Sequence, residues 1–407
     1  MQRKIKLPEE LKTSIRYAPQ EEVMQLTHRQ EKLFLGIPKE KQFQEKRIAL
    51  TPESVQVLVG RGHRVVVESK AGEGAHLSDS DYSEAGAEIA NQMEDVFKAN
   101  IILKTAPPSA EEVKMLHANQ VIISPLHLPT LDQSFLAEIL SKKVTALAYE
   151  YIRDESDNFP IVSAMSEIAG SAAILIAAEL LSHPNFGKGV LLGGIAGVPP
   201  ATVVILGAGT VAEFAARTAM ALGAEVKIFD NSIYKLKRLQ RNVGSRLFTS
   251  ILSNDALVDA LINADVAVGA IHSKSGRAPI VVTEEMVTQM KPGSVIMDVS
   301  IDQGGCFETS EVTNHRKPIF KKYDVIHYGV PNIASRVPRT ASQAISNVLT
   351  PMLLEAHEVG GFEKLMYSHP HIRNGVYVYK GTLTNEHLSE RFKMKYTDLN
   401  LLFTSGM

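Results

Sequence analysis

The stretch VVILGAGTVAEFAA, residues 203–216, decides how the second half of this chain folds. Its first four residues are aliphatic, which favours a buried strand. Gly207 and Gly209 then interrupt the run, and small and apolar residues at helical spacing follow them. A strand that passes through a glycine turn directly into a helix is typical of a βαβ unit in a parallel sheet. We therefore expect a strand, a tight turn and a helix here.

The turn has the spacing G-x-G-x-x-A and ends at Ala212. Glycines let the backbone approach a pyrophosphate closely, and the start of the helix attracts its negative charge. Alanine is allowed at the third place because that position governs only the packing of helix on strand. Asp230 ends the next apolar segment, where a carboxylate accepts a hydrogen bond from a ribose 2′-hydroxyl. The residues predicted to contact a dinucleotide are Gly207, Gly209, Thr210, Val211 and Asp230.

Asp230 also bears on the choice of dinucleotide. A carboxylate at this place repels a 2′-phosphate, which favours NAD over NADP. Three basic residues follow it closely, and their charge opposes that repulsion; they are Lys235, Lys237 and Arg238. NAD is therefore the expected cofactor, with NADP left open.

Apolar strands alternate with helices along most of the chain. Before the glycine turn, the segments that read as strands are 32–38, 63–69, 100–106, 120–126 and 144–152. After it they are 224–230, 264–270 and 293–300. Thr51 and Pro52 mark a helix start, with Thr51 as the expected N-cap. This alternation predicts parallel sheets with helices on both faces.

The length of 407 residues allows about two or three domains of roughly 150 residues each. We expect an α/β fold of two Rossmann-like domains with parallel sheets, separated by a cleft. Residues 161–339 form the predicted nucleotide-binding domain. Residues 33–160 form the substrate domain together with 340–407, because the helical tail is expected to pack back on it. Residues 1–32 are polar and charged, and we expect an N-terminal extension there.

The composition excludes several classes of partner. With 43 basic and 45 acidic side chains the formal charge is −2, so no global field favours nucleic acid or an anionic membrane. The single cysteine, Cys306, rules out an internal disulfide framework and a multi-cysteine metal site, and we expect no metal. A small-molecule substrate is the partner that fits such a chain.

The sequence does not predict a membrane protein or an exported one. The apolar run at 168–178 is too short to span a bilayer and is flanked by Glu167 and Glu179, so it reads as a buried helix. The N-terminus lacks the continuous apolar core of a signal peptide. The expected location is the cytoplasm.

Several segments in order resemble the alanine dehydrogenase family, whose relatives include the NAD-binding subunit of proton-translocating transhydrogenase. They are GIPKEKQFQEKRIALTPESV, AGEGAHLSDSDY, PLHLPT, ALAYE, SAMSEIAG, GAGTVA, MKPGSVIMDVSIDQGGCFE and YGVPNIASRVPRT. SAMSEIAG and SIDQGGCFE resemble the dehydrogenase branch. The resemblance implies a hexameric enzyme for NAD-linked oxidative deamination of L-alanine to pyruvate and ammonia, or the reverse.

The resemblance also implies roles for particular residues. Arg47 matches the arginine that binds the substrate carboxylate, although by itself it reads as a surface residue in a mixed-charge segment. His127 matches the catalytic histidine, which can act as acid and base near neutral pH, although a lone histidine in IISPLHLPT would by itself favour a packing role. Asp302 matches the carboxylate that positions or activates a water molecule.

Three further residues are predicted to lie near the cofactor. Ser166 matches a residue beside the pyrophosphate, and Asn332 matches one beside the nicotinamide and the substrate. Val268 lies near a predicted strand end, with Ala270 after it, and is expected to line the cofactor cleft. Asp298 reads instead as a structural acid.

The family pattern breaks in the segment ILKTAPP. The family has Lys-Val-Lys-Glu-Pro there, and its second lysine touches the substrate. In this chain Lys104 matches the first lysine, and Ala106 occupies the place of the second. Either Lys104, which points to the same face of a strand, reaches the substrate, or the substrate is different or larger.

Three functions therefore stay open on the sequence. The first is an NAD-dependent alanine dehydrogenase, or a dehydrogenase for a different amino acid. The second is a nicotinamide-nucleotide-binding module or sensor without chemistry, for which Ala106 is the support. The third is a transhydrogenase-like subunit, against which SIDQGG speaks.

Overall fold

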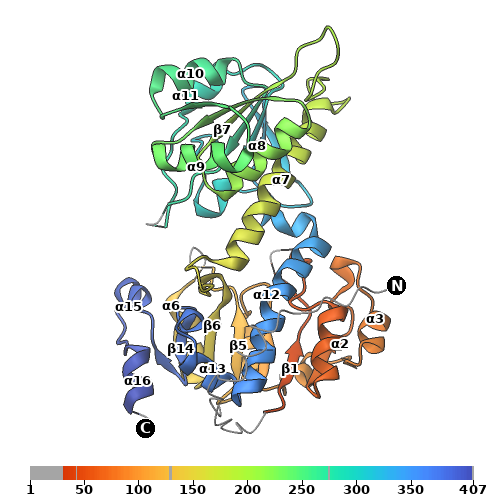
Figure 1. Ribbon diagram of the computed structural model, residues 1–407, viewed down its shortest axis with the longest axis vertical. Coiled ribbons are helices and arrows are strands. Elements are labelled where there is room, and N and C mark those ends of the chain that lie inside the picture. Colours follow the sequence, from red (N-terminus) through yellow and green to blue (C-terminus); the bar gives the residue numbers. More distant parts are fainter. Residues whose placement is uncertain (1–30, 43, 128–130, 274–275, 406–407) are drawn as a thin grey trace, which may run out of the picture.

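The computed structural model describes residues 31–42, 44–127, 131–273 and 276–405. They form two α/β domains, one below and one above the waist of the molecule in Figure 1, each built on one sheet. The expected class of two Rossmann-like domains is confirmed. The predicted extension, residues 1–32, lies outside the described residues except for Glu31 and Lys32.

The first domain contains an eight-stranded sheet of order β15-β14-β6-β5-β4-β1-β2-β3. Its strands are β1 (Phe34–Ile37), β2 (Arg64–Glu68), β3 (Glu88–Ala90), β4 (Ile101–Leu103), β5 (Val121–Ser124), β6 (Thr145–Ala148), β14 (Val376–Tyr379) and β15 (Thr382–Leu383). The helices between them are α2 (Pro52–Gly60), η1 (Glu73–Ala75), α3 (Asp79–Glu84), α4 (Met93–Val96), α5 (Ala110–Met115), α6 (Gln133–Ser141) and η3 (Tyr149–Tyr151).

The second domain contains a seven-stranded sheet of order β12-β13-β11-β10-β7-β8-β9. Its strands are β7 (Thr202–Leu206), β8 (Glu225–Phe229), β9 (Phe248–Ser250), β10 (Val266–Gly269), β11 (Val295–Asp298), β12 (Ile319–Lys322) and β13 (Val325–Tyr328). Its helices are α8 (Thr210–Ala221), α9 (Ile233–Val243), α10 (Asn254–Ile262), α11 (Glu284–Thr288), η4 (Val299–Gln303) and η5 (Ile333–Arg336).

Both sheets are mixed, which the sequence did not lead us to expect. The strands predicted from apolar segments pair in parallel, but β12 pairs antiparallel with β13, and β14 pairs antiparallel with β6 and β15. The tail was read as helical, and α12 (Pro338–Val359), α13 (Phe362–Ser368), α14 (Pro370–Arg373), α15 (Glu386–Phe392) and α16 (Leu399–Ser405) are helical. The short run VYVY between them is buried because it extends the sheet edge at β6.

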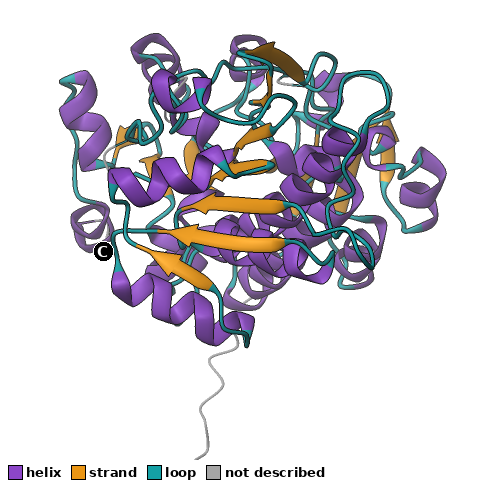
Figure 2. Cartoon of the chain, turned by 90° about the horizontal axis from the view of Figure 1, so that it is seen from above, coloured by secondary structure: helices purple, strands orange, loops and turns teal. Residues whose placement is uncertain are grey.

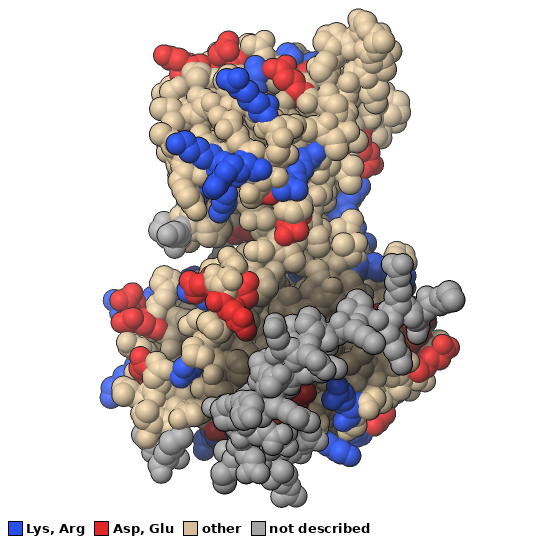
Figure 3. Space-filling view, viewed as in Figure 1, with Lys and Arg blue, Asp and Glu red and all other residues tan. Residues whose placement is uncertain are grey.

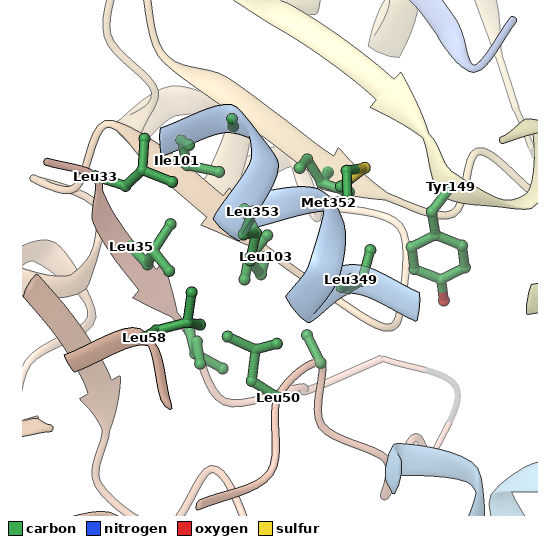
Figure 4. Packing of buried hydrophobic residues seen from close by; sticks show 14 of the residues in the cluster. Leu33, Leu35, Leu50, Leu58, Ile101, Leu103, Tyr149, Leu349, Met352 and Leu353 are labelled. Carbon is green, nitrogen blue, oxygen red and sulfur yellow. The ribbon is translucent and has the colours of Figure 1, made fainter. Parts of the chain in front are cut away.

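Alternate residues of each strand face two separate cores. Leu103 of β4 lies in one apolar cluster with α12, while Ile102 points to the opposite cluster with α6. This period of two is what a strand covered by helices on both faces requires, and Figure 2 shows helices on both sides of the strands. In Figure 4, Leu353 of α12 lies beside Leu103, and Leu349 and Met352 lie further along the same helix. Residues of the tail thus share an apolar cluster with the strands of the first domain.

The long helix α7 (Pro160–Ser182) runs from the first domain to the second (Figure 1). It is long and apolar enough to cross a membrane, but core helices of globular proteins also meet these two criteria. Here it packs tightly on α8: a Cβ at Gly170 would lie 2.3 Å from the carbonyl oxygen of Val211. Ten of its residues are buried, as expected for the apolar run at 168–178.

Candidate active site

The predicted catalytic and substrate-binding residues follow the carboxyl ends of parallel strands. The loops of the first domain carry Arg47, Lys104 and His127, and those of the second domain carry Asp302 and Asn332. The two sets meet, because Asn332 Nδ2 donates a hydrogen bond to Glu45 Oε2 at 2.6 Å. In Figure 3 the molecule narrows between the domains and is hollowed there. Ligands of α/β proteins bind in such a crevice at the carboxyl ends of strands.

Arg47 is held in a bidentate ion pair with Glu45. Its Nε donates to Glu45 Oε1 at 2.8 Å and its Nη2 donates to Oε2 at 2.6 Å. Its remaining nitrogen, Nη1, lies 3.2 Å from the sulfur of Met165 on α7. Because a guanidinium carries five N–H groups in a planar fork, the Nη1–Nη2 edge keeps donors for a second carboxylate.

The ion pair keeps both partners charged although both are buried. Burial by itself lowers the pKa of Arg47, but the charge and hydrogen bonds of Glu45 outweigh it and raise the pKa. Burial likewise raises the pKa of Glu45, yet Arg47 brings it below its usual value. With Arg47 only 8 % exposed, a carboxylate bound to it would be largely shielded from water.

His127 stands on a loop whose backbone is fixed by Glu150. Glu150 Oε1 accepts hydrogen bonds from the amides of Leu126 at 2.7 Å and His127 at 3.3 Å. Burial lowers the pKa of the His127 imidazole, against the charge of Asp302, which raises it. A neutral imidazole at neutral pH can accept a proton. The rest of the PLHLPT motif, residues 128–130, lies outside the described residues.

Asp302 interacts electrostatically with His127 from the other domain. Burial among protein atoms raises the pKa of Asp302 above its usual value. A hydrogen bond from the Asn332 amide, 3.2 Å long, and the charges of His127 and Arg47 oppose this rise only in part. Part of its surface is nevertheless open to solvent. A carboxylate that is surrounded by protein and still reaches water lies in the wall of a cleft, where it can hold a water molecule.

Lys104 is bound to two carboxylates. Its Nζ lies 2.7 Å from Glu40 Oε2 and 2.7 Å from Glu112 Oε1, and the residue is 1 % exposed. Burial lowers the pKa of Lys104, but the two carboxylates outweigh this effect and hold the pKa above its usual value. A contact with substrate therefore stays a prediction and would need the third ammonium hydrogen. Ala106, in the place of the family's second lysine, is itself buried, with 2 % of its surface exposed.

The glycine turn has the geometry that a dinucleotide needs. Gly207 has φ of +109°, and a Cβ there would lie 2.4 Å from the carbonyl oxygen of Ala270. A Cβ at Gly209 would meet no atom within 4 Å, so a ligand can approach the backbone there. Helix α8 starts at the next residue with no side-chain cap, which leaves its first amides for a phosphate.

Asp230 closes the site at the end of β8. Its Oδ2 accepts a hydrogen bond from the amide of Ala208 at 2.8 Å, and Oδ1 accepts one from the amide of Ser232 at 2.7 Å. Each carboxylate oxygen has a second lone pair, so a ribose hydroxyl can still be bound. The residues around the turn thus fit a dinucleotide.

The other predicted cofactor residues are placed differently from one another. Thr210 and Val211 are half-buried in the first turn of α8, and Ser166 is half-buried on α7 beside Met165. Val268 needs a correction, because it is 0 % exposed in the core of the second domain and has no surface for a ligand. The alternation along β10 turns it inward, and Ala270, beyond the strand end, is half-buried instead.

The site also contains residues that the sequence reasoning missed. They are Glu45 beside Arg47, Glu150 beside His127, Met165 beside Arg47 and Ser335 beside Glu45. All four lie inside the motifs quoted for the resemblance, so their motifs were the available signal. Their contacts join segments that are far apart in the sequence, which spacing alone does not reveal.

Asp298 is a structural acid, as it read in the sequence. It is 2 % exposed and accepts hydrogen bonds from the amides of Ser300 at 3.1 Å and Cys306 at 3.0 Å. Within the described ranges, no three His, Cys, Asp or Glu side chains come together as metal ligands would.

These features define the class: a two-domain oxidoreductase with a Rossmann-like nucleotide-binding fold. Comparison with known protein families shows which family of oxidoreductases the chain belongs to. The model described as alanine dehydrogenase/PNT, N-terminal domain, matches residues 36–169, and the one described as alanine dehydrogenase/PNT, C-terminal domain, matches residues 173–386. The chain belongs to the alanine dehydrogenase/PNT family.

Individual relatives agree with this. An alanine dehydrogenase of Halomonas elongata is 39% identical over 365 residues, which cover 89% of this chain and 98% of the relative. Alanine dehydrogenase 2 of Staphylococcus aureus is 38% identical over 89% of this chain and 97% of its own. A solved L-alanine dehydrogenase superposes with a TM-score of 0.83 at 37% identity, over 88% of this chain and 99% of that one. A transhydrogenase from Sinorhizobium meliloti superposes with 0.73 at 26% identity, over 87% and 99%.

Proposed function

We propose that this chain catalyses the NAD-dependent oxidative deamination of L-alanine to pyruvate and ammonia, and the reverse reaction. The observation that carries the proposal is the chain of hydrogen bonds at the domain junction that joins Arg47 through Glu45 and Asn332 to Asp302. His127 interacts electrostatically with the same Asp302. An amino acid needs the same set: a cation for its carboxylate, a base for its amine and a site for water.

Arg47 binds the carboxylate of alanine or pyruvate through its Nη1–Nη2 edge. Because Glu45 already orients the guanidinium, the ligand loses little freedom of the arginine when it binds. Met165 Sδ lies 3.2 Å from Nη1, next to the edge that would receive the carboxylate. Bidentate binding fixes the orientation of the carboxylate and so limits where Cα lies.

His127 moves the protons. The lowered pKa of the imidazole leaves it neutral at neutral pH, so it can take the proton from the substrate ammonium. His127 releases this first proton to solvent, and hydride transfer from Cα gives an iminium ion. A water molecule held by Asp302 adds to the iminium carbon while His127 accepts a proton from that water, and the Asp302 charge stabilises the resulting imidazolium. His127 passes this proton to the amino group, the C–N bond breaks, and the hydroxyl group loses its proton to the departing ammonia and becomes the carbonyl of pyruvate; the reverse sequence aminates pyruvate.

The second domain holds the dinucleotide, which supplies the hydride acceptor when it is bound. Gly207, Gly209 and the first turn of α8 would hold the pyrophosphate, with Ser166 near it. Asp230 would accept a hydrogen bond from the adenosine ribose, which favours NAD. Asn332, whose amide donates to Asp302, would lie near the nicotinamide.

Ala106 supports a second candidate, a dehydrogenase for another amino acid of the same chemistry. A charge-assisted contact is missing at this place, which costs roughly ten- to a hundredfold in substrate binding. Lys104, tied to Glu40 and Glu112, is a structural cation in our view. A binding module without chemistry fits less well, because Arg47, His127 and Asp302 are all present and Asp302 interacts electrostatically with the other two.

The remaining expectations belong to the proposal. The substrate domain comprises 33–160 and 340–407, and the nucleotide domain 161–339. The enzyme is cytoplasmic, stays off the membrane and assembles as a homo-hexamer, as the family resemblance implies.

The test is NADH consumption by the purified protein with ammonia and a panel of 2-oxo acids. Pyruvate is expected to give the highest kcat/KM. Faster turnover of a longer 2-oxo acid would favour the second candidate. NADH binding without consumption of any of them would contradict both.

A further inference from the structure

Glu45 is the most heavily hydrogen-bonded side chain at the junction. Its Oε1 accepts from the amides of Lys46 at 3.0 Å and Arg47 at 2.9 Å, and from Ser335 Oγ at 2.9 Å. Its Oε2 accepts from Asn332 Nδ2 at 2.6 Å. The bidentate pair with Arg47 adds two more donors. A buried carboxylate with six donors is fully satisfied and holds each of them in place.

The donors come from two parts of the fold. Arg47 belongs to the loop between β1 and α2, whereas Asn332 and Ser335 belong to the segment that follows β13. Asn332 is in the left-handed region, with φ of +56°, and its amide donates to Asp302 Oδ1 at 3.2 Å. One continuous chain of hydrogen bonds thus runs from Arg47 through Glu45 and Asn332 to Asp302.

We infer that Glu45 is a positioning residue that orients Arg47 toward the substrate and ties it to Asn332 across the domain junction. The inference rests on the proposed function, in which Arg47 binds the substrate carboxylate. A bidentate partner fixes the plane of the guanidinium, so the Nη1–Nη2 edge points one way. Without that partner the arginine must lose the freedom of its long side chain when substrate binds.

The tie also couples substrate binding to the geometry of the cleft. The domains cannot separate at this place without breaking the 2.6 Å bond between Asn332 and Glu45. Any change there reaches both the cation that binds the carboxylate and the acid that holds water. Affinity for the 2-oxo acid therefore depends on this bond. Affinity for the dinucleotide does not, because the glycine turn lies in the second domain alone.

The test compares Glu45→Gln with a matched control, Ser342 on α12, whose side chain contacts the same loop. Glutamine keeps the size of the side chain but loses the charge and turns an N–H group toward Arg47 or Asn332. Ser342→Ala removes a buried hydrogen bond of similar kind, because Ser342 Oγ accepts from the amide of Ile48 at 2.9 Å without touching Glu45. Steady-state kinetics with NADH, ammonia and pyruvate are measured for both, together with NADH affinity by fluorescence and the thermal midpoint.

For Glu45→Gln we expect the KM for pyruvate to rise about tenfold or more, with NADH affinity unchanged within about twofold. Ser342→Ala is expected to lower the thermal midpoint and leave KM unchanged. A purely structural Glu45 would behave as Ser342 does, and that result overturns the inference.

Ser335→Ala serves if Glu45→Gln does not fold. It removes one of the six donors and leaves the ion pair, so a rise in KM of about two- to fivefold is expected. An unchanged KM in this variant also overturns the inference. Failure of the proposed function looks different, because the wild-type protein would then consume no NADH with any 2-oxo acid.

Discussion

Glu150 holds the backbone at His127 by two hydrogen bonds: its Oε1 accepts from the amides of Leu126 and His127 at 2.7 and 3.3 Å. His127 has φ of +49°, a region that residues other than glycine seldom adopt. The other carboxyl oxygen of Glu150, Oε2, is buried and has no hydrogen-bond partner among the described residues. The strain in the loop is thus held by a carboxyl group that is itself only half satisfied.

This arrangement predicts a pH-dependent stability. Burial raises the pKa of Glu150 from its ordinary 4.5 to about 7. The folded state therefore binds more protons than the unfolded state between these values, so stability falls as pH rises from about 4.5 to about 7 and then levels off. Urea unfolding at pH 5 and pH 8 should show a smaller difference for Glu150→Gln than for the wild type. Equal differences would contradict the prediction.

The same contact predicts a split between two substitutions for activity. Glutamine keeps an oxygen that accepts from both amides, so Glu150→Gln should retain most of the turnover. Glu150→Ala removes the acceptor and should lower kcat by about tenfold or more, because it releases His127. Steady-state kinetics measure this. Equal kcat in the two variants would show that turnover does not depend on the hydrogen bonds from the Leu126 and His127 amides to Glu150.

Lys104 gives a stability prediction. Removing it leaves Glu40 and Glu112 buried without their cation, so Lys104→Met should cost about 3–5 kcal/mol of unfolding free energy. The control is Lys98→Met, since Lys98 pairs with Asp95 at 2.7 Å on the surface, where such a pair contributes about 0–1 kcal/mol. Denaturant unfolding measures both. A small loss for Lys104→Met would mean that the cluster relaxes, and would reopen the substrate role of Lys104.

Ala106 gives a prediction about substrate affinity. Lysine restores the cation of the family pattern, so Ala106→Lys should lower the KM for pyruvate by about tenfold. Ala106→Met has a similar length without the charge and should not lower it. Equal KM values in the two variants would show that this position does not face the substrate carboxylate.

The sequence predicted the fold well because its signals there are local. The glycine turn and the apolar strands each depend on neighbouring residues, and the structure confirms the elements built from them. Helix α2 also begins at Pro52 as expected, but the Thr51 side chain makes no capping hydrogen bond. The VYVY strand was missed because it is short and lies among helices, so its role depends on the free edge of β6.

The site was less accessible to sequence reasoning. Family motifs pointed to Arg47, His127 and Asp302, but their partners depend on tertiary contacts. Glu45 reaches Asn332 across most of the chain length, and no spacing rule links them. Val268 was misplaced for a related reason: its position near a strand end suggested the cleft, while the pleat of β10 turns it into the core.

The most direct test of the central claim is a comparison of His127→Ala with the wild type. If His127 moves the protons of an amino-acid dehydrogenase, the variant should bind NADH within a few fold of the wild type. Its turnover of NADH with pyruvate and ammonia should fall by about a hundredfold or more. Undiminished turnover in the variant would return His127 to a packing role and contradict the account.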